Sequence, residues 1–328
     1  MSDSRSEPNA ARAAGTPAGT SISATEAAVP SVEPVRTAED LIELLRPTAP
    51  RWAPIPTERV FRGQRDSSWK LLPSAYRSEA WKRFARAGEA PFDAEASSST
   101  SDEEFAVLLR FLEGLDLSGL DVPNDIFMRP LFEEGPTGLL SFPLDAAALI
   151  FVALAQHNGV PTRLLDWTRA GLNAAYFAAT GAAKHATEKK ERVEALSIWA
   201  LRTNFAGWAD QNLGQQNSPY APGLRVVTAP RASNPNLHAQ AGVFTESWSA
   251  IVAPLEAIVG DLLVRLARDS SAPWPPAQPP LVRFDLPTAQ APRLLRLLAY
   301  EQVDAARMFP GLGGVVAAIQ EQSLWDRP

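Results

Sequence analysis

The chain has 328 residues, of which 45% are hydrophobic and 21% charged, so it is globular and long enough for one large domain or two small ones. Its formal charge of −6 argues against a dedicated nucleic-acid surface, because such a surface needs clustered Lys and Arg. The absence of cysteine excludes disulfides, thiolate catalysis and zinc sites with sulfur ligands.

Two further features concern location. No stretch approaches the roughly 18 consecutive apolar residues that a membrane-spanning helix needs. The first residues, Met1 to Glu7, lack the basic and then apolar pattern of a signal peptide. We therefore expect a cytoplasmic protein that has no membrane partner.

The N-terminal segment differs in composition from the rest. Residues 1–34 are mostly Ala, Ser, Thr, Pro and Glu, so their ordering would cost entropy with little burial in return, and we predict a disordered tail. We expect a single domain over 35–325. Thr37 to Asp40 resembles a capping box at the start of its first helix. Polar or charged composition predicts inserted loops at 86–104, 183–193 and 204–220.

The polar chemistry is concentrated between two apolar helical runs. Asp145 is a suitable N-cap for the first helix, and Asn158-Gly159 is a suitable end, since Gly tolerates the left-handed conformation. A short strand or tight loop is expected from Thr162 to Trp167. Thr168 would then cap a second helix that runs through Ala179.

Other strands are indicated by their β-branched and aromatic residues. The first is Arg59 to Gln64, and its Arg62 could hold a phosphate or carboxylate with its fork of donors. The alternative is a surface ion pair. Later strands are expected at 195–201, 224–228 and 281–285, and another is expected to carry Gln240. Because strands and helices are interspersed without regular alternation, we predict an α+β fold with a mixed, mainly antiparallel sheet and flanking helices.

The chain contains five motif blocks in succession: Phe61-Arg62-Gly63-Gln64, Leu72-Pro73-Ser74, His157 to Thr168 with Ala174 to Ala178, Gln240 to Thr245, and Met308 to Gly314. Together they resemble the FRG domain family, which is named for its Phe/Tyr-Arg-Gly motif. The resemblance covers roughly residues 58–320.

A more distant likeness is to ADP-ribosyltransferases of the Arg-Ser-Glu class. In those enzymes an aromatic-Arg-Gly on the first strand holds the phosphates of NAD, and Phe61-Arg62-Gly63 is similar to it. Asp166-Trp167-Thr168 is similar to their Ser-Thr-Ser strand. The catalytic glutamate has no clear counterpart, because Gln240 stands in its approximate place and has no charge to stabilise a developing cation.

The resemblance and the residue types together define a candidate site, for which we expect no metal. The candidate catalytic residues are His157, Asp166 and Gln240. The candidate ligand-binding residues are Phe61, Arg62, Gly63, Gln64, Thr162, Arg163, Trp167 and Thr168. His157, His185 and His238 share no ligand spacing.

Each candidate also has a structural interpretation. His157 is either a general base or phosphate donor, or a donor to the last carbonyls of its helix. Arg163 and Asp166 are either a ligand anchor and an acid, or a local ion pair that fixes the turn. Trp167 either stacks on a base or lies in the core. Thr162 and Thr168 are most simply caps and turn formers.

Two functions from different classes agree with these residues. The first is an enzyme that uses NAD or a related nucleotide as substrate, either an ADP-ribosyltransferase with a protein acceptor or an NAD glycohydrolase. The second is a non-catalytic module that senses a nucleotide or docks a protein, for example in bacterial stress or phage defence. Neither requires a permanently bound cofactor.

Overall fold

The computed structural model describes residues 30–52, 58–86, 93, 100–141, 143–188, 193–213, 221–228, 235–249, 251–269, 274 and 279–325. Residues 1–29 of the predicted tail lie outside this part of the chain. The end of that predicted tail is wrong, because Ser31–Pro34 forms strand β1 and pairs in parallel with a strand near the C-terminus. A run of four residues with alternating burial is too short to be recognised from composition alone.

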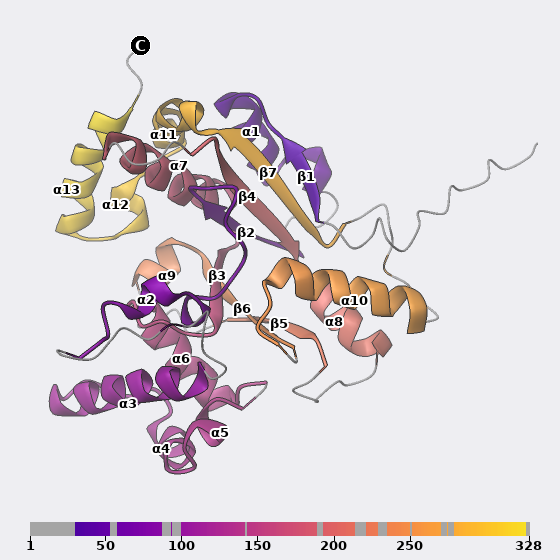
Figure 1. Ribbon diagram of the computed structural model, residues 1–328. Coiled ribbons are helices and arrows are strands. Elements are labelled where there is room, and N and C mark those ends of the chain that lie inside the picture. The colour runs from indigo at the N-terminus through magenta and orange to yellow at the C-terminus, as the bar shows by residue number, and fades with distance from the viewer. Residues whose placement is uncertain are drawn as a thin grey trace, which may run out of the picture.

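The described strands form one mixed sheet in the order β1-β7-β4-β2-β3-β6-β5 (Figure 1). Among the described strands, β1 and β7 are parallel and every other neighbouring pair is antiparallel, so the predicted α+β class with a mixed, mainly antiparallel sheet is confirmed. The strands after β1 are β2 Arg59–Gln64, β3 Leu164–Thr168, β4 Ala195–Arg202, β5 Gly223–Val227, β6 Gly242–Trp248 and β7 Leu281–Pro287.

The sheet is split between its two central strands. Strand β2 pairs with β4 along its whole length, and β3 does the same with β6. Between β2 and β3, however, the register holds only Phe61 opposite Thr168 in the described chain. The sheet therefore consists of two half-sheets, β1-β7-β4-β2 and β3-β6-β5, which diverge from this point. Beyond this one pair, the facing backbone edges of β2 and β3 are not paired with each other in the described chain.

Three groups of helices pack on the sheet (Figure 1), two of them against one half-sheet each and the third against strands of both. Helices α1, α7 and α11 pack on the first half-sheet around a core that includes Phe61 and Phe284. Helices α3 to α6 form a second core with Leu164 and Phe244, and α8 and α10 pack in a third core with Trp167 and Trp199. The helix bounds are α1 Ala38–Leu45, α2 Ser78–Trp81, α3 Ser101–Leu117, α4 Asp125–Glu133, α5 Pro136–Leu139, α6 Ala146–His157, α7 Gly171–Thr187, α8 Thr203–Leu213, α9 Pro235–Ala239, α10 Leu255–Asp269, α11 Ala291–Tyr300, α12 Ala305–Met308 and α13 Leu312–Glu321.

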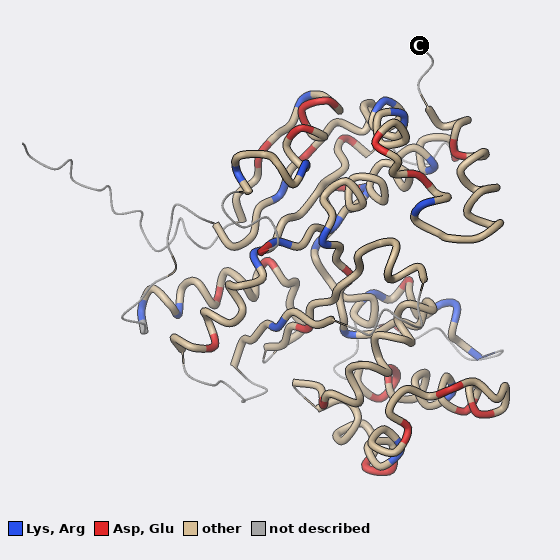
Figure 2. The backbone as a smooth tube through the Cα atoms, turned by 180° about the vertical axis from the view of Figure 1, so that it is seen from behind, with Lys and Arg blue, Asp and Glu red and all other residues tan. Residues whose placement is uncertain are grey.

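Charge and apolar length add two observations about the surface. Basic and acidic residues are interspersed over most of the described chain, and acidic residues prevail along α3 and α4 (Figure 2). Within the described residues, no helix has the length and apolar character required to cross a membrane.

Two predicted caps are confirmed. The side chain of Thr37 accepts a hydrogen bond from the Asp40 amide at 3.1 Å, and that of Asp145 accepts from the Ala147 amide at 2.8 Å. Helix α6 ends at His157, and Gly159 after it has a φ of 89°. The helix that leads to the polar segment thus begins and ends where capping chemistry places its ends.

Each predicted inserted loop is partly helical, which corrects its bounds. Helix α3 begins at Ser101, α7 continues to Thr187, and α8 occupies Thr203–Leu213. Many residues of α8 are polar, so their composition predicts a loop. Its apolar residues nevertheless have helical spacing, and Phe205, Ala206 and Ala209 are buried on one face. The rest of the three predicted loops, residues 87–92, 94–99, 189–192 and 214–220, lies outside the described residues.

Two predictions near the site are also wrong. Thr168 is the last residue of β3 rather than a helix cap, and α7 begins later, at Gly171. The Thr168 hydroxyl instead accepts from the Ala170 amide at 3.0 Å. Gln240 is not on a strand, because it lies in the turn between α9 and β6.

Candidate functional site

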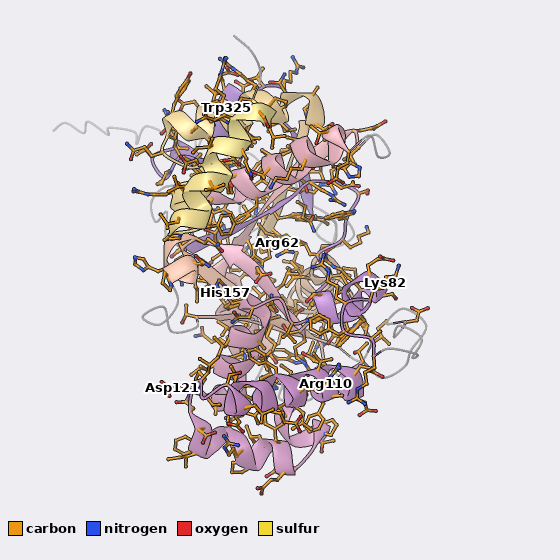
Figure 3. The ribbon with its side chains drawn as sticks, turned by 90° about the vertical axis from the view of Figure 1, so that its left-hand side faces the viewer. Arg62, Lys82, Arg110, Asp121, His157 and Trp325 are labelled. Atoms are coloured by element: carbon orange, nitrogen blue, oxygen red, sulfur yellow. The ribbon has the colours of Figure 1, made fainter. Side chains whose placement is uncertain are left out.

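A pocket of about 450 Å³ lies where β2 and β3 diverge. Its walls come from both half-sheets and from the ends of α6, α7, α9 and α12, so distant parts of the chain meet there (Figure 3). Most of the predicted site residues line it, namely Phe61, Arg62, Gly63, His157, Asp166, Trp167, Thr168 and Gln240. The expected convergence of the Phe-Arg-Gly strand with the central polar segment is therefore present.

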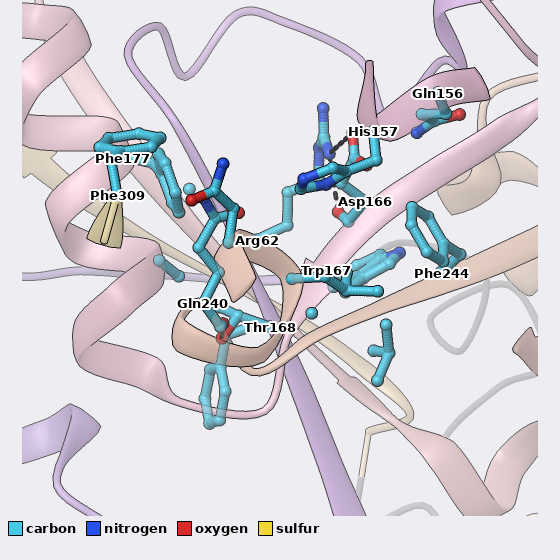
Figure 4. A pocket seen from close by; sticks show the side chains of 17 residues that line it. Arg62, Gln156, His157, Asp166, Trp167, Thr168, Phe177, Gln240, Phe244 and Phe309 are labelled. Carbon is cyan, nitrogen blue, oxygen red and sulfur yellow. Dashed lines mark hydrogen bonds and ion pairs between the residues drawn. The ribbon is translucent and has the colours of Figure 1, made fainter. Parts of the chain in front are cut away.

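Arg62 bridges the split at the polar end of the pocket (Figure 4). Its Nη1 donates to the Asp166 backbone carbonyl at 2.7 Å and lies 3.7 Å from the Asp166 Oδ2. The Nε of Arg62 is buried and has no hydrogen-bond partner among the described residues. Burial lowers the pKa of Arg62, partly offset by Asp166. The guanidinium thus spans the gap between the two half-sheets.

Asp166 is surrounded by cationic or titratable groups. Its carboxylate is 60% exposed, whereas the Arg62 side chain is 17% exposed. Arg77 is near enough for both charges to act on it, and burial followed by repulsion from Arg62 lowers the pKa of Arg77 to about 10. Burial also lowers the pKa of His157, against the opposing effect of Asp166. The charge of Asp166 therefore acts on both arginines, although only Arg62 pairs with it among the described residues, and His157 is mainly neutral near pH 7.

The other end of the pocket is aromatic. Phe177 of α7 and Phe309 after α12 meet edge to face, with ring centroids 6.3 Å apart, and each remains 38% exposed. Both lie away from the Arg62 guanidinium and beside Gln240 (Figure 4). Large aromatic side chains that remain partly exposed in a pocket can pack against the ring of a ligand.

Trp167 and Phe61 belong mainly to the core, although both reach the pocket wall. Each is 4% exposed. The Trp167 Nε1 donates to the Thr245 hydroxyl at 2.9 Å, and Phe61 packs edge to face on Trp52 with centroids 5.3 Å apart. Their fixed contacts make them floor residues rather than free stacking platforms.

Gln240 joins the turn before β6 to three other elements. Its backbone carbonyl accepts from the Thr168 hydroxyl at 2.7 Å and from the Asn173 Nδ2 at 3.1 Å. Its side-chain Nε2 donates to the Met308 carbonyl at 3.2 Å. Gln240 thus helps to hold the aromatic end of the pocket in place.

Gly63 has a packing role. A Cβ atom at this position would lie 1.9 Å from the Ala174 carbonyl oxygen, so only glycine allows α7 to lie this close to β2. Because Ala174 also lines the pocket, this close approach sets the position of one wall.

Three predicted ligand-binding residues lie outside the pocket. Arg163 is 1% exposed, and its Nε donates to Glu104 Oε2 at 3.0 Å while its Nη1 donates to the Leu140 carbonyl at 2.8 Å. Asp166 is therefore not its partner. Thr162 is fully buried, and its hydroxyl contacts Gln156. Gln64 is buried and accepts from the Trp199 Nε1 at 2.8 Å.

Several pocket residues were not predicted as site residues. They are Gln156, Ala174, Phe177, Asn236, Leu237, Gly242, Val243, Phe244 and Phe309. Phe177 and Phe309 belong to motif blocks that resemble the FRG family, and this membership was the signal that could have identified them. Their residue type alone did not indicate a role in a site. Among the described residues, no group of three His, Asp or Glu side chains could hold a metal ion.

Comparison with known proteins agrees with the motif. Residues 134–187 match the FRG domain model, and this segment contains α6, β3 and α7, which supply much of the pocket. No curated protein and no solved structure matches the chain. The likeness to ADP-ribosyltransferases therefore stays a prediction. The predicted resemblance to the FRG domain is therefore confirmed for residues 134–187.

Proposed function

We propose that the pocket binds NAD or a related nucleotide. The observation that carries this proposal is the polarity of the pocket, which has the Arg62 guanidinium at one end and two partly exposed phenyl rings at the other. A nucleotide has the matching polarity, with anionic phosphates at one end of a ribose and a planar base at the other. The volume of about 450 Å³ falls in the range of small-molecule sites.

Phosphate binding is assigned to Arg62. Its carboxylate neighbour lies at 3.7 Å, beyond hydrogen-bond distance. Arg77 adds a second positive charge close to the first. An anion that approaches Arg62 would replace a weak, exposed contact with charge-assisted hydrogen bonds.

A second candidate function is cleavage of the bound NAD, and the observation that supports it is the exposed carboxylate of Asp166. Asp166 is the carboxylate residue that lines the pocket in the described chain, and it is well exposed. In such a reaction the bond between nicotinamide and ribose breaks, nicotinamide leaves with the electron pair, and a water or a protein acceptor attacks the ribose carbon. Asp166 would stabilise the positive charge on the ribose, and neutral His157 would take the proton of the attacking group.

Calorimetry with NAD followed by an assay for released nicotinamide tests both candidates. We expect saturable binding that Arg62→Ala weakens. Release of nicotinamide that is lost in Asp166→Asn, with binding retained, would support the enzyme. Binding without release would support a nucleotide-sensing module, and the absence of NAD binding would contradict both.

A further inference from the structure

The Gln240 side chain has its orientation fixed by the backbone. The Nε2 donates to the Met308 carbonyl at 3.2 Å. The reverse orientation of the amide would place Oε1 against that carbonyl, and two acceptors facing each other would repel. The main chain of Gln240 is also held, because its own carbonyl accepts from Thr168 and Asn173. The amide therefore cannot turn over to suit a ligand without losing a hydrogen bond.

The remaining amide oxygen is available to the pocket. Gln240 lines the pocket, and its Oε1 has no hydrogen-bond partner among the described residues. This oxygen is not buried, because it is absent from the set of buried side-chain atoms without a hydrogen-bond partner, so solvent reaches it. The aromatic end of the pocket thus presents an acceptor whose direction is set by the protein.

This acceptor lies beside the phenyl rings. Phe309 follows Met308 directly, so the hydrogen bond from Gln240 to Met308 also holds the chain that carries the Phe309 ring. Figure 4 shows Gln240 next to Phe177 and Phe309. A planar ring packed on either phenyl group would bring its edge toward the Gln240 amide.

We propose that Gln240 selects, at the nucleotide site proposed above, an aromatic ring that carries an amino or carboxamide N–H donor at its edge. Two parts of NAD have this chemistry, the 6-amino group of adenine and the carboxamide of nicotinamide. A ring whose edge offers an oxygen at the same position would face Oε1 with another acceptor, and its binding would be weaker.

Competitive binding to the full chain distinguishes the two rings. The probes are NAD, its counterpart with hypoxanthine in place of adenine, and its counterpart with nicotinic acid in place of nicotinamide. We expect one of the two analogues to bind about tenfold more weakly than NAD, which corresponds to one lost hydrogen bond. The weaker analogue identifies the ring that Gln240 contacts.

A variant then assigns the discrimination to Gln240. Gln240→Met keeps the length of the side chain and removes its acceptor, so NAD and the discriminated analogue should bind with equal affinity. Gln156→Met is the matched control, because Gln156 lines the same pocket but its Oε1 already accepts from the Thr162 hydroxyl. This control should keep the ratio between NAD and the analogue.

The outcomes separate this inference from the proposed function. No binding of NAD to the wild-type chain would overturn both. Binding of NAD and both analogues with equal affinity would overturn only the role of Gln240, and this comparison needs no variant. Discrimination that persists in a folded Gln240→Met variant, as judged by an unchanged melting temperature, would also overturn it.

Discussion

Two arginines of the motif blocks, Arg163 and Arg62, form ion pairs that differ in burial. Arg163 and Glu104 are almost fully buried, with exposures of 1% and 0%, and the guanidinium also donates to the Leu140 carbonyl. Arg62 and Asp166 lie at the pocket, where the carboxylate is 60% exposed and Nη1 is 3.7 Å from Oδ2. The first pair joins α3 to the segment before β3, and the second spans the split between β2 and β3.

The difference between the pairs teaches which arginine can bind a ligand. Removing one member of a buried pair leaves an uncompensated charge, so such a pair is fixed by its own desolvation. In the Arg62–Asp166 pair the carboxylate is exposed and lies beyond hydrogen-bond distance, so another anion can take its place beside Arg62. Arg163 therefore has a structural role, and Arg62 is the arginine that can bind an anion.

The largest effect is expected from Arg163→Met. This change leaves the fully buried Glu104 without its cation and should lower the free energy of unfolding by about 3–5 kcal/mol. Urea unfolding measures the loss. Arg129→Met, which removes the exposed ion pairs of Arg129 with Asp116 of α3 and Asp125 of α4, is the control and should lower the free energy of unfolding much less. A loss of that small size in Arg163→Met would mean that the two pairs are alike.

Arg62→Ala should affect binding more than stability. If Arg62 contacts a phosphate, the variant should bind NAD about 1.5–3 kcal/mol more weakly, because a charge-assisted hydrogen bond is lost. Calorimetry and a melting curve on the same sample compare the two quantities. Unchanged affinity with a lowered melting temperature would show that Arg62 is a structural residue like Arg163.

The smallest expected effect is a shift in the pKa of His157, which lies near the Arg62–Asp166 pair. Burial lowers the pKa of His157 below 6.5 in the folded chain, so its contribution to stability is present above pH 6.5 and is lost as the pH falls through the folded pKa. An NMR titration of the imidazole should therefore show a midpoint below 6.5. In Asp166→Asn the midpoint should fall further, because the negative charge that opposes burial is gone. A wild-type midpoint above 6.5 would contradict this account.

Helix caps and the ends of elements could be predicted where residues that are close in sequence determine them. Thr37 and Asp145 cap their helices as expected, since a cap needs only the amides of the next turn. Strand β2 and the end of α6 also lie where predicted. The bounds of α8 were missed because its buried face is defined by α10, which is distant in sequence.

The candidate site was predictable as a set of motifs but not as a geometry. Arg62, His157 and Asp166 meet in one pocket as expected. Arg163 occurs in the same motif as Asp166, three residues away, yet it contacts Glu104, which is 59 residues distant. The sequence shows that Arg163 and Asp166 are charged, but it does not show which of them is buried. Their burial depends on the packing of α3.

The sequence by itself determined the capped helices, the α+β class and the family motif, because these depend on side-chain type and short-range spacing. Only the tertiary structure decided the split between β2 and β3, the separate fates of Arg62 and Arg163, and the direction in which the Gln240 amide points. Each of these depends on contacts between residues that are far apart in the chain, where packing and desolvation, rather than local preference, set the free energy.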